Sequence, residues 1–226
     1  MREQERRDEM PLVHRVEQLL DKNSLEFLGG FFELLVIRVV GLGILALQRR
    51  QPVLLALDAC VHLRSLFGTR AVPLSQFFTG YRTTVLRQGE FIESVEIPRL
   101  KSNELLKVYK ISKRFDDDIS AVCFALWLKL DVDVIIDVRI GCGGMAATPA
   151  RAFKTEDALR GKTFDEAALH AAGAALALDF QPLDDVRASA AYRLAVTASL
   201  LRRAWIEWRS GESLQVMTWQ PEVRHA

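Results

Sequence analysis

Residues 105–144 of the 226-residue chain read LLKVYKISKRFDDDISAVCFALWLKLDVDVIIDVRIGCGG, and this stretch decides the expected fold. Apolar and polar residues alternate over 105–113 and again over 132–144, which is typical of strands with one buried face. The middle segment, 119–130, is almost continuously apolar, as expected of a central strand that is buried on both faces. Only residues 131–133 separate the last two segments, so we expect these to pair as an antiparallel hairpin.

The region after this sheet, residues 150–208, predicts helices. It contains 16 alanines, which favour helix formation and let helices approach closely. Thr163 and Glu166 have the spacing of a capping box, which predicts a helix from 164 to about 177. A last helix is expected from about 185 to 208, with an apolar stripe made of Ala190, Leu194, Ala198, Leu201, Trp205 and Trp208. The fold class is therefore α+β, with a three-stranded antiparallel sheet packed on a C-terminal helical layer.

Residues 52–100 predict short strands and turns. The segment VLLALDA (53–59) is expected to continue into a hairpin that extends to residue 74. In this hairpin, apolar and polar residues alternate over CVHLRS (60–65), and a Gly-Thr turn follows at 68–69. The segment SQFFTGYRTT (75–84) predicts a loop that carries aromatic side chains. Residues 90–98 predict a further strand, which a proline ends.

The first 51 residues look unlike the rest of the chain. The apolar run 25–47 has the length needed to cross a bilayer. Three charged residues interrupt it, however: Glu26, Glu33 and Arg38. Because charges inside a span are costly, a buried or poorly formed soluble segment is the favoured interpretation and a membrane span the less favoured one. The run stops before Pro52, where we expect a domain boundary.

Composition excludes several classes of protein and nominates none. Lys plus Arg number 30 and Asp plus Glu number 29, so the formal charge of +1 gives no electrostatic argument for a nucleic-acid partner or an anionic membrane. The N-terminal residues mix both charge signs and do not have the pattern of a signal peptide. The three cysteines, Cys60, Cys123 and Cys142, are too widely spaced for a CxxC site and fit a reducing compartment. We therefore expect a cytoplasmic protein without a metal site of its own.

Two local motifs each allow two interpretations. The glycine-rich stretch 141–144 follows a predicted strand, where it either cradles a phosphate or forms a tight turn, and the turn is the favoured interpretation. The polar cluster KRFDDD (113–118) either turns the chain before the next strand or lies beside a charged cofactor. In the second case Lys110 or Arg114 would face a phosphate or an electron-rich ring. The sequence contains no nucleophile–base pattern such as GxSxG, so no catalytic residue is nominated.

From about Pro52 to Trp208 the chain resembles the C-terminal two-thirds of the FAD-binding portion of xanthine dehydrogenase small subunits. This portion is the flavoprotein module of the molybdenum hydroxylases, and carbon monoxide dehydrogenase medium subunits share it. The resemblance is carried by long blocks in the same order: PVLLALDA, GTRAVPLSQFFTGYRTTVLRQGEFIESVEIP, KVYKISKRFDDDISAV, GGMAATPARA and DDVRASAAYRLAVTASLLRRAWIE. It divides the chain into an atypical segment (1–51), part of an FAD-binding subdomain (52–100), a CO-dehydrogenase-flavoprotein-like C-terminal domain (101–210) and a tail (211–226).

The resemblance implies a redox role. Members of the family oxidise purines such as xanthine at a molybdopterin centre, and electrons pass through two iron–sulfur clusters to FAD and then to NAD. It implies FAD as the cofactor and a molybdopterin-binding large subunit as the partner. The family's FAD contacts correspond here to Ile92 and Lys110. Asp117, in the KRFDDD segment, would lie beside the flavin and tune its potential or the access of nicotinamide.

The chain departs from the family pattern before Pro52. Relatives carry a cysteine-rich iron–sulfur domain and a Gly-rich pyrophosphate loop, and because this sequence has neither, it resembles an N-terminally truncated subunit. Where relatives have a GGN-x-x-x-x-SPIGD-type segment that holds FAD, residues 41–52 read GLGILALQRRQP. We therefore hypothesise that residues 1 to about 50 are a foreign or frame-shifted sequence joined to a family tail.

Three functions follow from these patterns. In the first, the chain is the FAD-binding part of a xanthine dehydrogenase-type enzyme, and alone it binds FAD weakly or not at all and is inactive. In the second, it is a non-catalytic remnant or a partner-binding module. In the third, it is a small membrane-anchored protein that uses residues 25–47.

Overall fold

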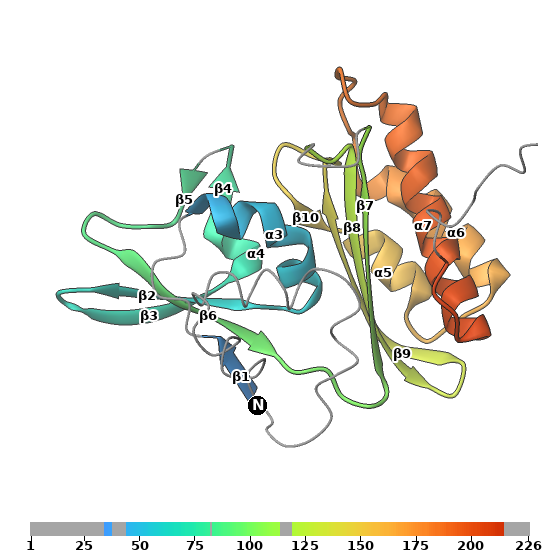
Figure 1. The fold of residues 1–226 in the computed structure, drawn as a ribbon, viewed down its shortest axis with the longest axis horizontal. Helices are drawn as coiled ribbons and strands as arrows, with labels where there is room; N and C mark the ends of the chain where they lie inside the picture. Colours follow the sequence, from blue (N-terminus) through green and yellow to red (C-terminus); the bar gives the residue numbers. More distant parts are fainter. Residues whose placement is uncertain (1–33, 38–43, 82, 114–118, 215–226) are drawn as a thin grey trace, which may run out of the picture. The chain divides into compact units, whose positions relative to one another are not determined.

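In the computed structural model the chain divides into two compact units, residues 1–101 and 102–226 (Figure 1). The described residues are 34–37, 44–81, 83–113 and 119–214, with side chains described from residue 50 onward. Asp117 and most of the apolar run 25–47 lie outside these ranges. No helix within them is long and apolar enough to span a membrane. Each unit has a hydrophobic core of its own.

The first unit is built on a four-stranded antiparallel sheet with the strand order β1-β6-β2-β3. Its elements are β1 (Leu34–Ile37), α3 (Ile44–Ala56), β2 (Cys60–Ser65), β3 (Gly68–Pro73), α4 (Leu74–Phe77), β4 (Phe78–Gly80), β5 (Thr83–Thr84) and β6 (Phe91–Pro98). The β2–β3 hairpin and β6 lie where the alternation predicts strands. Side chains of α3, α4 and the sheet meet in one core.

Two segments of the first unit differ from the prediction. Residues 53–56 form the last turn of α3 and not the start of a strand, because a short apolar run suits a buried helix as well as a buried strand. Pro52 lies inside α3 and does not end it. The expected loop at 75–84 contributes to α4 and forms the β4–β5 pair. The buried ring of Phe77, which meets the ring of Phe78 edge-on, anchors this segment in the core.

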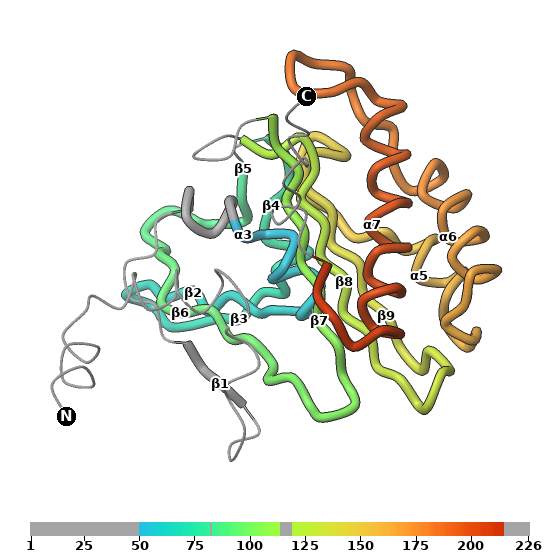
Figure 2. Tube along the Cα trace, turned by 45° about the vertical axis from the view of Figure 1, so that its right-hand side comes forward, coloured from blue at the N-terminus to red at the C-terminus, as the bar shows by residue number. Residues whose placement is uncertain are grey.

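The second unit is an antiparallel sheet with three helices on one face (Figure 1, Figure 2). Its elements are β7 (Glu104–Ile111), β8 (Val122–Asp131), β9 (Val134–Gly143), β10 (Ala150–Arg151), α5 (Phe153–Leu159), α6 (Glu166–Asp179) and α7 (Ala190–Ser210). The strand order is β10-β9-β8-β7, so the predicted hairpin of β8 and β9 is confirmed. The α+β class and the three long strands are confirmed as well, and the two-residue β10 adds a fourth strand.

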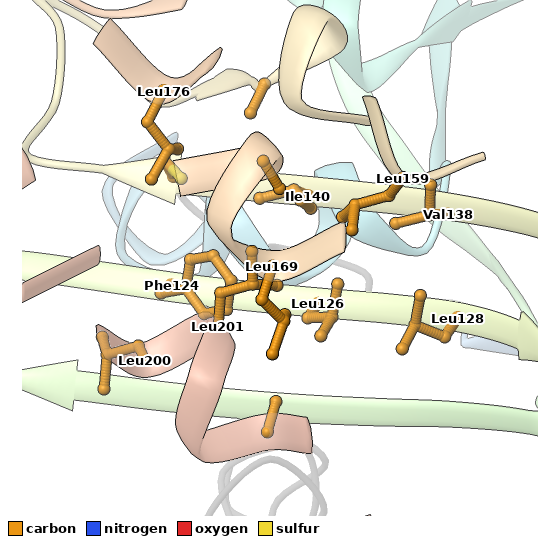
Figure 3. Close-up of a cluster of buried hydrophobic side chains, with 14 of the residues drawn as sticks. Phe124, Leu126, Leu128, Val138, Ile140, Leu159, Leu169, Leu176, Leu200 and Leu201 are labelled. Atoms are coloured by element: carbon orange, nitrogen blue, oxygen red, sulfur yellow. The ribbon is translucent and has the colours of Figure 1, made fainter. Parts of the chain in front are cut away.

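Successive side chains of the strands point to opposite faces of this sheet. Phe124, Leu126 and Ile140 point toward the helices, where they meet Leu169 of α6 and Leu201 of α7 (Figure 3). Each fully buried side chain of this size contributes about 2 kcal/mol, so the shared core fixes the helices on the sheet. Residues between these core positions belong to the other face of the sheet, which carries the candidate site.

The helices begin at residues other than those predicted. The N-cap of α6 is Asp165, whose carboxylate accepts a hydrogen bond from the backbone N–H of Ala168, so Thr163 is not the cap. Asp caps a helix at least as well as Thr, and here it lies directly before the first turn. The last helix begins after its N-cap Ser189, several residues later than expected. The preceding residues are held by hydrogen bonds to Asp185 instead.

The buried stripe of α7 also differs from the predicted one. Leu194 and Ala198 of the predicted stripe are only half-buried. The buried residues are Arg193, Thr197, Leu200, Leu201, Ala204 and Glu207. Two charged side chains therefore lie in the interior of the second unit, one near each end of the helix.

Candidate functional site

Of the three nominated residues, the structure describes Ile92 and Lys110. Lys110 lies on β7 in the second unit, and its side chain is exposed. Ile92 lies on β6 in the first unit, where it is 7% exposed and packs in the core. Its side chain thus has little surface left for a ligand. Asp117 lies outside the described residues.

Lys110 belongs to the sheet face that points away from the helices. It pairs across the sheet with Cys123, which in turn pairs with Gly143. These three residues are called the Lys110 row. The neighbouring row on the same face consists of Val108, Ala125 and Gly141. Val108 and Lys110 are exposed, Cys123 is half-buried, and Ala125, Gly141 and Gly143 are buried. The accessible part of this face is therefore its edge on β7, where Lys110 places a cation that suits an electron-rich ring.

Cys123 adds no charge to this surface. Burial raises the pKa of its thiol to about 11, although the nearby charge of Lys110 works in the opposite direction. The thiol is therefore protonated at neutral pH and is not a nucleophile. Among the described residues, no group of three or more His, Cys, Asp or Glu side chains is placed to hold a metal ion.

The opposite end of this face is closed by paired polar groups. The guanidinium of Arg139 lies 4.0 Å from the centre of the Trp127 ring, and it lies 3.6 Å from Asp137. The indole N–H of Trp127 donates to Glu104 at 3.3 Å. Cation and acids are thus matched here, whereas no acidic residue within the described ranges pairs with Lys110.

The glycine-rich stretch forms a strand end and a turn. Gly141 and Gly143 lie in the β8–β9 ladder, and β10 pairs with the same end of β9. Gly144 then adopts a φ of +79°, which glycine tolerates best. A Cβ atom there would collide with the carbonyl oxygen of Ala121. This backbone is committed to the sheet and a tight turn, so it does not form an open loop for a phosphate.

Arg193 is a residue of this region that the sequence analysis did not nominate. It lies in the first turn of α7 and donates to the carbonyl oxygens of Ala121 and Gly144. It also donates to the carboxylate of Asp185 at 2.6 Å. Arg193 is not part of the apolar stripe predicted for this helix. Its position in the block DDVRASAAYR, which carries the family resemblance, is the one sequence feature that could have indicated it.

Both units match known families. Residues 50–100 match the FAD binding domain in molybdopterin dehydrogenase, and residues 107–208 match the CO dehydrogenase flavoprotein C-terminal domain. Nicotinate hydroxylase of Emericella nidulans is 35% identical over 161 residues, which are 68% of this chain and 12% of that protein. Xanthine dehydrogenase of the same organism is 39% identical over 132 residues, which are 57% of this chain and 10% of that protein.

The fold matches a solved structure as well. Carbon monoxide dehydrogenase from Hydrogenophaga pseudoflava superposes with a TM-score of 0.63 at 28% identity, over 67% of this chain and 54% of that one. This chain therefore spans about half of that relative and about a tenth of the two curated ones. Through residues 50–100 and 107–208, the chain belongs to the FAD-binding flavoproteins of the molybdenum hydroxylase family.

Proposed function

We propose that this chain forms the flavin-holding part of a molybdenum hydroxylase, in which electrons leave a molybdenum centre and reach an acceptor through FAD. The observation that carries the proposal is the exposed ammonium of Lys110 at the edge of a face of small residues. This face lies within the stretch that matches the flavoprotein domain. When bound, FAD would supply the reversible one- and two-electron transfer that this role requires.

The residues of the second unit fit the ring of FAD. A reduced flavin ring gains negative charge, and a cation beside it favours that form, so Lys110 would raise the flavin's tendency to accept electrons. The neutral thiol of Cys123 does not oppose this effect. We propose that Asp117 lies beside the flavin and works in the opposite direction, because a carboxylate disfavours added negative charge.

The first unit contributes less to holding FAD. The buried Ile92 offers a ligand little more than the edge of its side chain. Residues 44–56, ILALQRRQPVLLA, form α3 and contain no glycine, serine or acid that could build a phosphate loop. We therefore propose that the isolated chain binds FAD weakly, and that another polypeptide supplies the site for the pyrophosphate.

The substrate is proposed to be chosen by the partner. The relatives are, by their names, a nicotinate hydroxylase, a xanthine dehydrogenase and a carbon monoxide dehydrogenase, so one flavin module accompanies several substrates. We propose a molybdopterin-binding large subunit as the partner, a purine as its substrate, NAD as the acceptor and the cytoplasm as the location. Copurification of the chain with a large molybdenum-binding protein tests the partnership.

Residues 1–51 are proposed to have a separate origin. The match to the FAD binding domain begins at residue 50, close to Pro52, where the first sequence block of the resemblance begins. For the remainder we propose part of an FAD-binding subdomain at 52–100, a flavoprotein C-terminal domain at 101–210 and a tail at 211–226. Sequencing the gene in all frames checks the proposal, and family motifs in another frame upstream of codon 50 are the expected result. An upstream region without such motifs in any frame would exclude a frame shift.

Titrating the purified full chain with FAD tests the proposed function, with flavin fluorescence and absorbance as readouts. We expect saturable binding by the wild type, and about tenfold weaker binding by Lys110→Met, because a charge-assisted contact is lost. Lys129→Met is the matched control, since Lys129 lies at the opposite end of the same sheet face. It should bind FAD like the wild type.

A folded wild-type chain that binds no FAD would contradict the proposal. That result would favour the second function, a partner-binding module, which one observation supports. Leu66 and Phe67, at the tip of the β2–β3 hairpin, are 98% and 99% exposed. Two adjacent apolar side chains rarely project so far unless another surface covers them.

A further inference from the structure

Arg193 is a charged side chain buried where α7 meets the end of the sheet. It is 3% exposed. One terminal nitrogen of its guanidinium donates to the carbonyl oxygen of Ala121 and, at 2.8 Å, to that of Gly144. The other donates to Asp185 at 2.6 Å. Burying an unpaired guanidinium costs several kcal/mol of desolvation free energy. These three contacts offset part of that cost, so Arg193 can lie in the interior.

The two carbonyl groups mark the ends of the strands that carry the candidate flavin face. Ala121 directly precedes β8, and its N–H donates to the carbonyl oxygen of Ile111 at the end of β7, at 2.7 Å. Gly144 directly follows β9. The Lys110 row lies immediately beside this junction. The guanidinium thus ties the start of β8 to the end of β9, and the backbone of Ala121 links this junction to the end of β7.

Asp185 fixes the guanidinium from the other side. Its carboxylate accepts backbone hydrogen bonds from Arg187 at 2.8 Å and Ala188 at 3.1 Å. The bond from Arg187 is the largest cause that lowers the pKa of Asp185 to about 2, so this carboxylate is ionised at neutral pH. The ammonium of Lys113 donates to the carbonyl oxygen of Val186 at 2.7 Å, which ties the same turn to the chain after β7.

Packing alone does not require an arginine at this position. The Nε atom of Arg193 is buried and has no acceptor within the described residues, which costs about 1–3 kcal/mol. An apolar side chain would avoid that cost and the desolvation of the charge. Glycine at 144 is required chiefly by its φ of +79° and by the carbonyl oxygen of Ala121, with which a Cβ atom would collide, and the guanidinium, 2.9 Å from the same Cβ position, occupies the same space. The position of Arg193 therefore loses stability to maintain this contact.

We propose that Arg193 is a positioning residue for flavin binding. By holding the carbonyl groups of Ala121 and Gly144, it fixes the strand ends beside the row, so that the exposed side chain of Lys110 is held in a set position toward the ring. This inference rests on the proposed function, because it concerns the same site. Arg193 acts through these backbone groups and not by contact with the flavin.

The test compares FAD binding by the full-length wild type and by Arg193→Lys, Arg193→Met and Arg203→Met. Arg203 is the matched control, because it lies on the same helix but contacts Glu207 and the ring of Tyr109 on the helix-covered face of the sheet, instead of the carbonyl groups of Ala121 and Gly144. Arg193→Met should weaken FAD binding about tenfold, since charge-assisted hydrogen bonds are lost. Arg193→Lys should recover part of the affinity, because an ammonium still donates to a carbonyl group. Arg203→Met should lower the melting temperature and leave the affinity unchanged.

Amide hydrogen exchange of the same proteins gives a readout that does not depend on FAD. Arg193→Met should speed exchange in residues 121–123 and 143–146, and Arg203→Met should not. Affinity that stays at the wild-type value in folded Arg193→Met, or that falls equally in Arg203→Met, overturns the inference. A wild-type chain that binds no FAD overturns the proposed function itself, and the exchange rates then decide separately whether Arg193 orders the strand ends.

Discussion

Val132, at the tip of the β8–β9 hairpin, is a residue in a conformation that its side chain disfavours. Its φ is +53°, in the left-handed region, where a β-branched side chain is strained. It is also 84% exposed, so burial does not compensate for the strain. Asn enters this region far more readily than Val. We expect Val132→Asn to raise the free energy of unfolding by about 1 kcal/mol, measured by urea denaturation.

Val134→Asn is the control for this prediction. Val134 begins β9 two residues later and lies in the extended ladder opposite Asp131. Asn is disfavoured in strands, so this substitution should not stabilise the protein. An equal gain at both positions would show that polarity at the hairpin tip matters, and not the left-handed backbone.

Glu207 is a buried carboxylate near the end of α7, and it is 3% exposed. It accepts hydrogen bonds from the hydroxyl of Tyr109 at 2.9 Å and from Arg203 at 2.8 Å, and its carboxylate lies 3.1 Å from the ammonium of Lys107. Burial by itself raises the pKa of Glu207, but these partners outweigh it and the net pKa is lowered. Burial, followed by the bond to Glu207, raises the pKa of Tyr109, so its hydroxyl remains a donor.

Glu207→Gln should lower the free energy of unfolding by about 3 kcal/mol at pH 7, because it removes one partner from a buried ionic cluster. The folded-state pKa of Glu207 is lowered, so its stabilising effect is present above the unfolded pKa of about 4.3 and is lost as pH falls through the folded value. Denaturation of both proteins at pH 7 and in acid should therefore show the difference between them shrinking. Glu212→Gln, an exposed substitution, should have no effect at either pH. A difference that is independent of pH would contradict the ionic explanation.

At the scale of elements, the strands of the second unit follow from the sequence because their cause is local. Period-two alternation over 105–113 assigned Val108 and Lys110 to one face and Tyr109 to the other, and in the structure Tyr109 is buried while the other two are exposed. The short link at 131–133 allowed only an antiparallel pairing.

The helices were less predictable because distant residues decide which of their side chains are buried. Arg193 is buried because Ala121, 72 positions away, accepts its hydrogen bond. Glu207 is buried because Tyr109, 98 positions away, donates to it. An apolar pattern cannot show such partners, so the predicted stripe on α7 missed both charged residues. The strand misassignment at 53–56 has another cause, since four apolar residues have no period that distinguishes helix from strand.

The candidate site combines both kinds of information. Lys110 was nominated through the family resemblance, and the structure adds the small residues of its row. The role of Arg193 depends on where its guanidinium lies relative to two carbonyl groups, which no spacing in the sequence reveals. The burial of Ile92 could be inferred only once β6 was placed in the core of the first unit.

At the scale of the whole molecule, the features that suit a flavin are unevenly distributed. The exposed cation Lys110 belongs to the second unit, whereas residues 44–56 of the first unit form α3 and contain no glycine, serine or acid for a phosphate loop. The proposed function therefore assigns the ring contacts to the second unit and assigns no contact with the adenylate half of FAD to α3.

FMN tests this division, because it shares the ring with FAD and lacks the adenylate half. If the second unit supplies most of the binding, FMN and FAD should bind the full chain with affinities within about threefold, a difference below 1 kcal/mol. Thermal unfolding provides the measurement, because a ligand at a hundred times its Kd stabilises the folded state by about 2.7 kcal/mol. Adenosine diphosphate at the same concentration should give no shift. If FAD stabilises the chain far more than FMN does, the prediction is contradicted. The chain itself would then hold the adenylate half of FAD, through residues other than those of the Lys110 row.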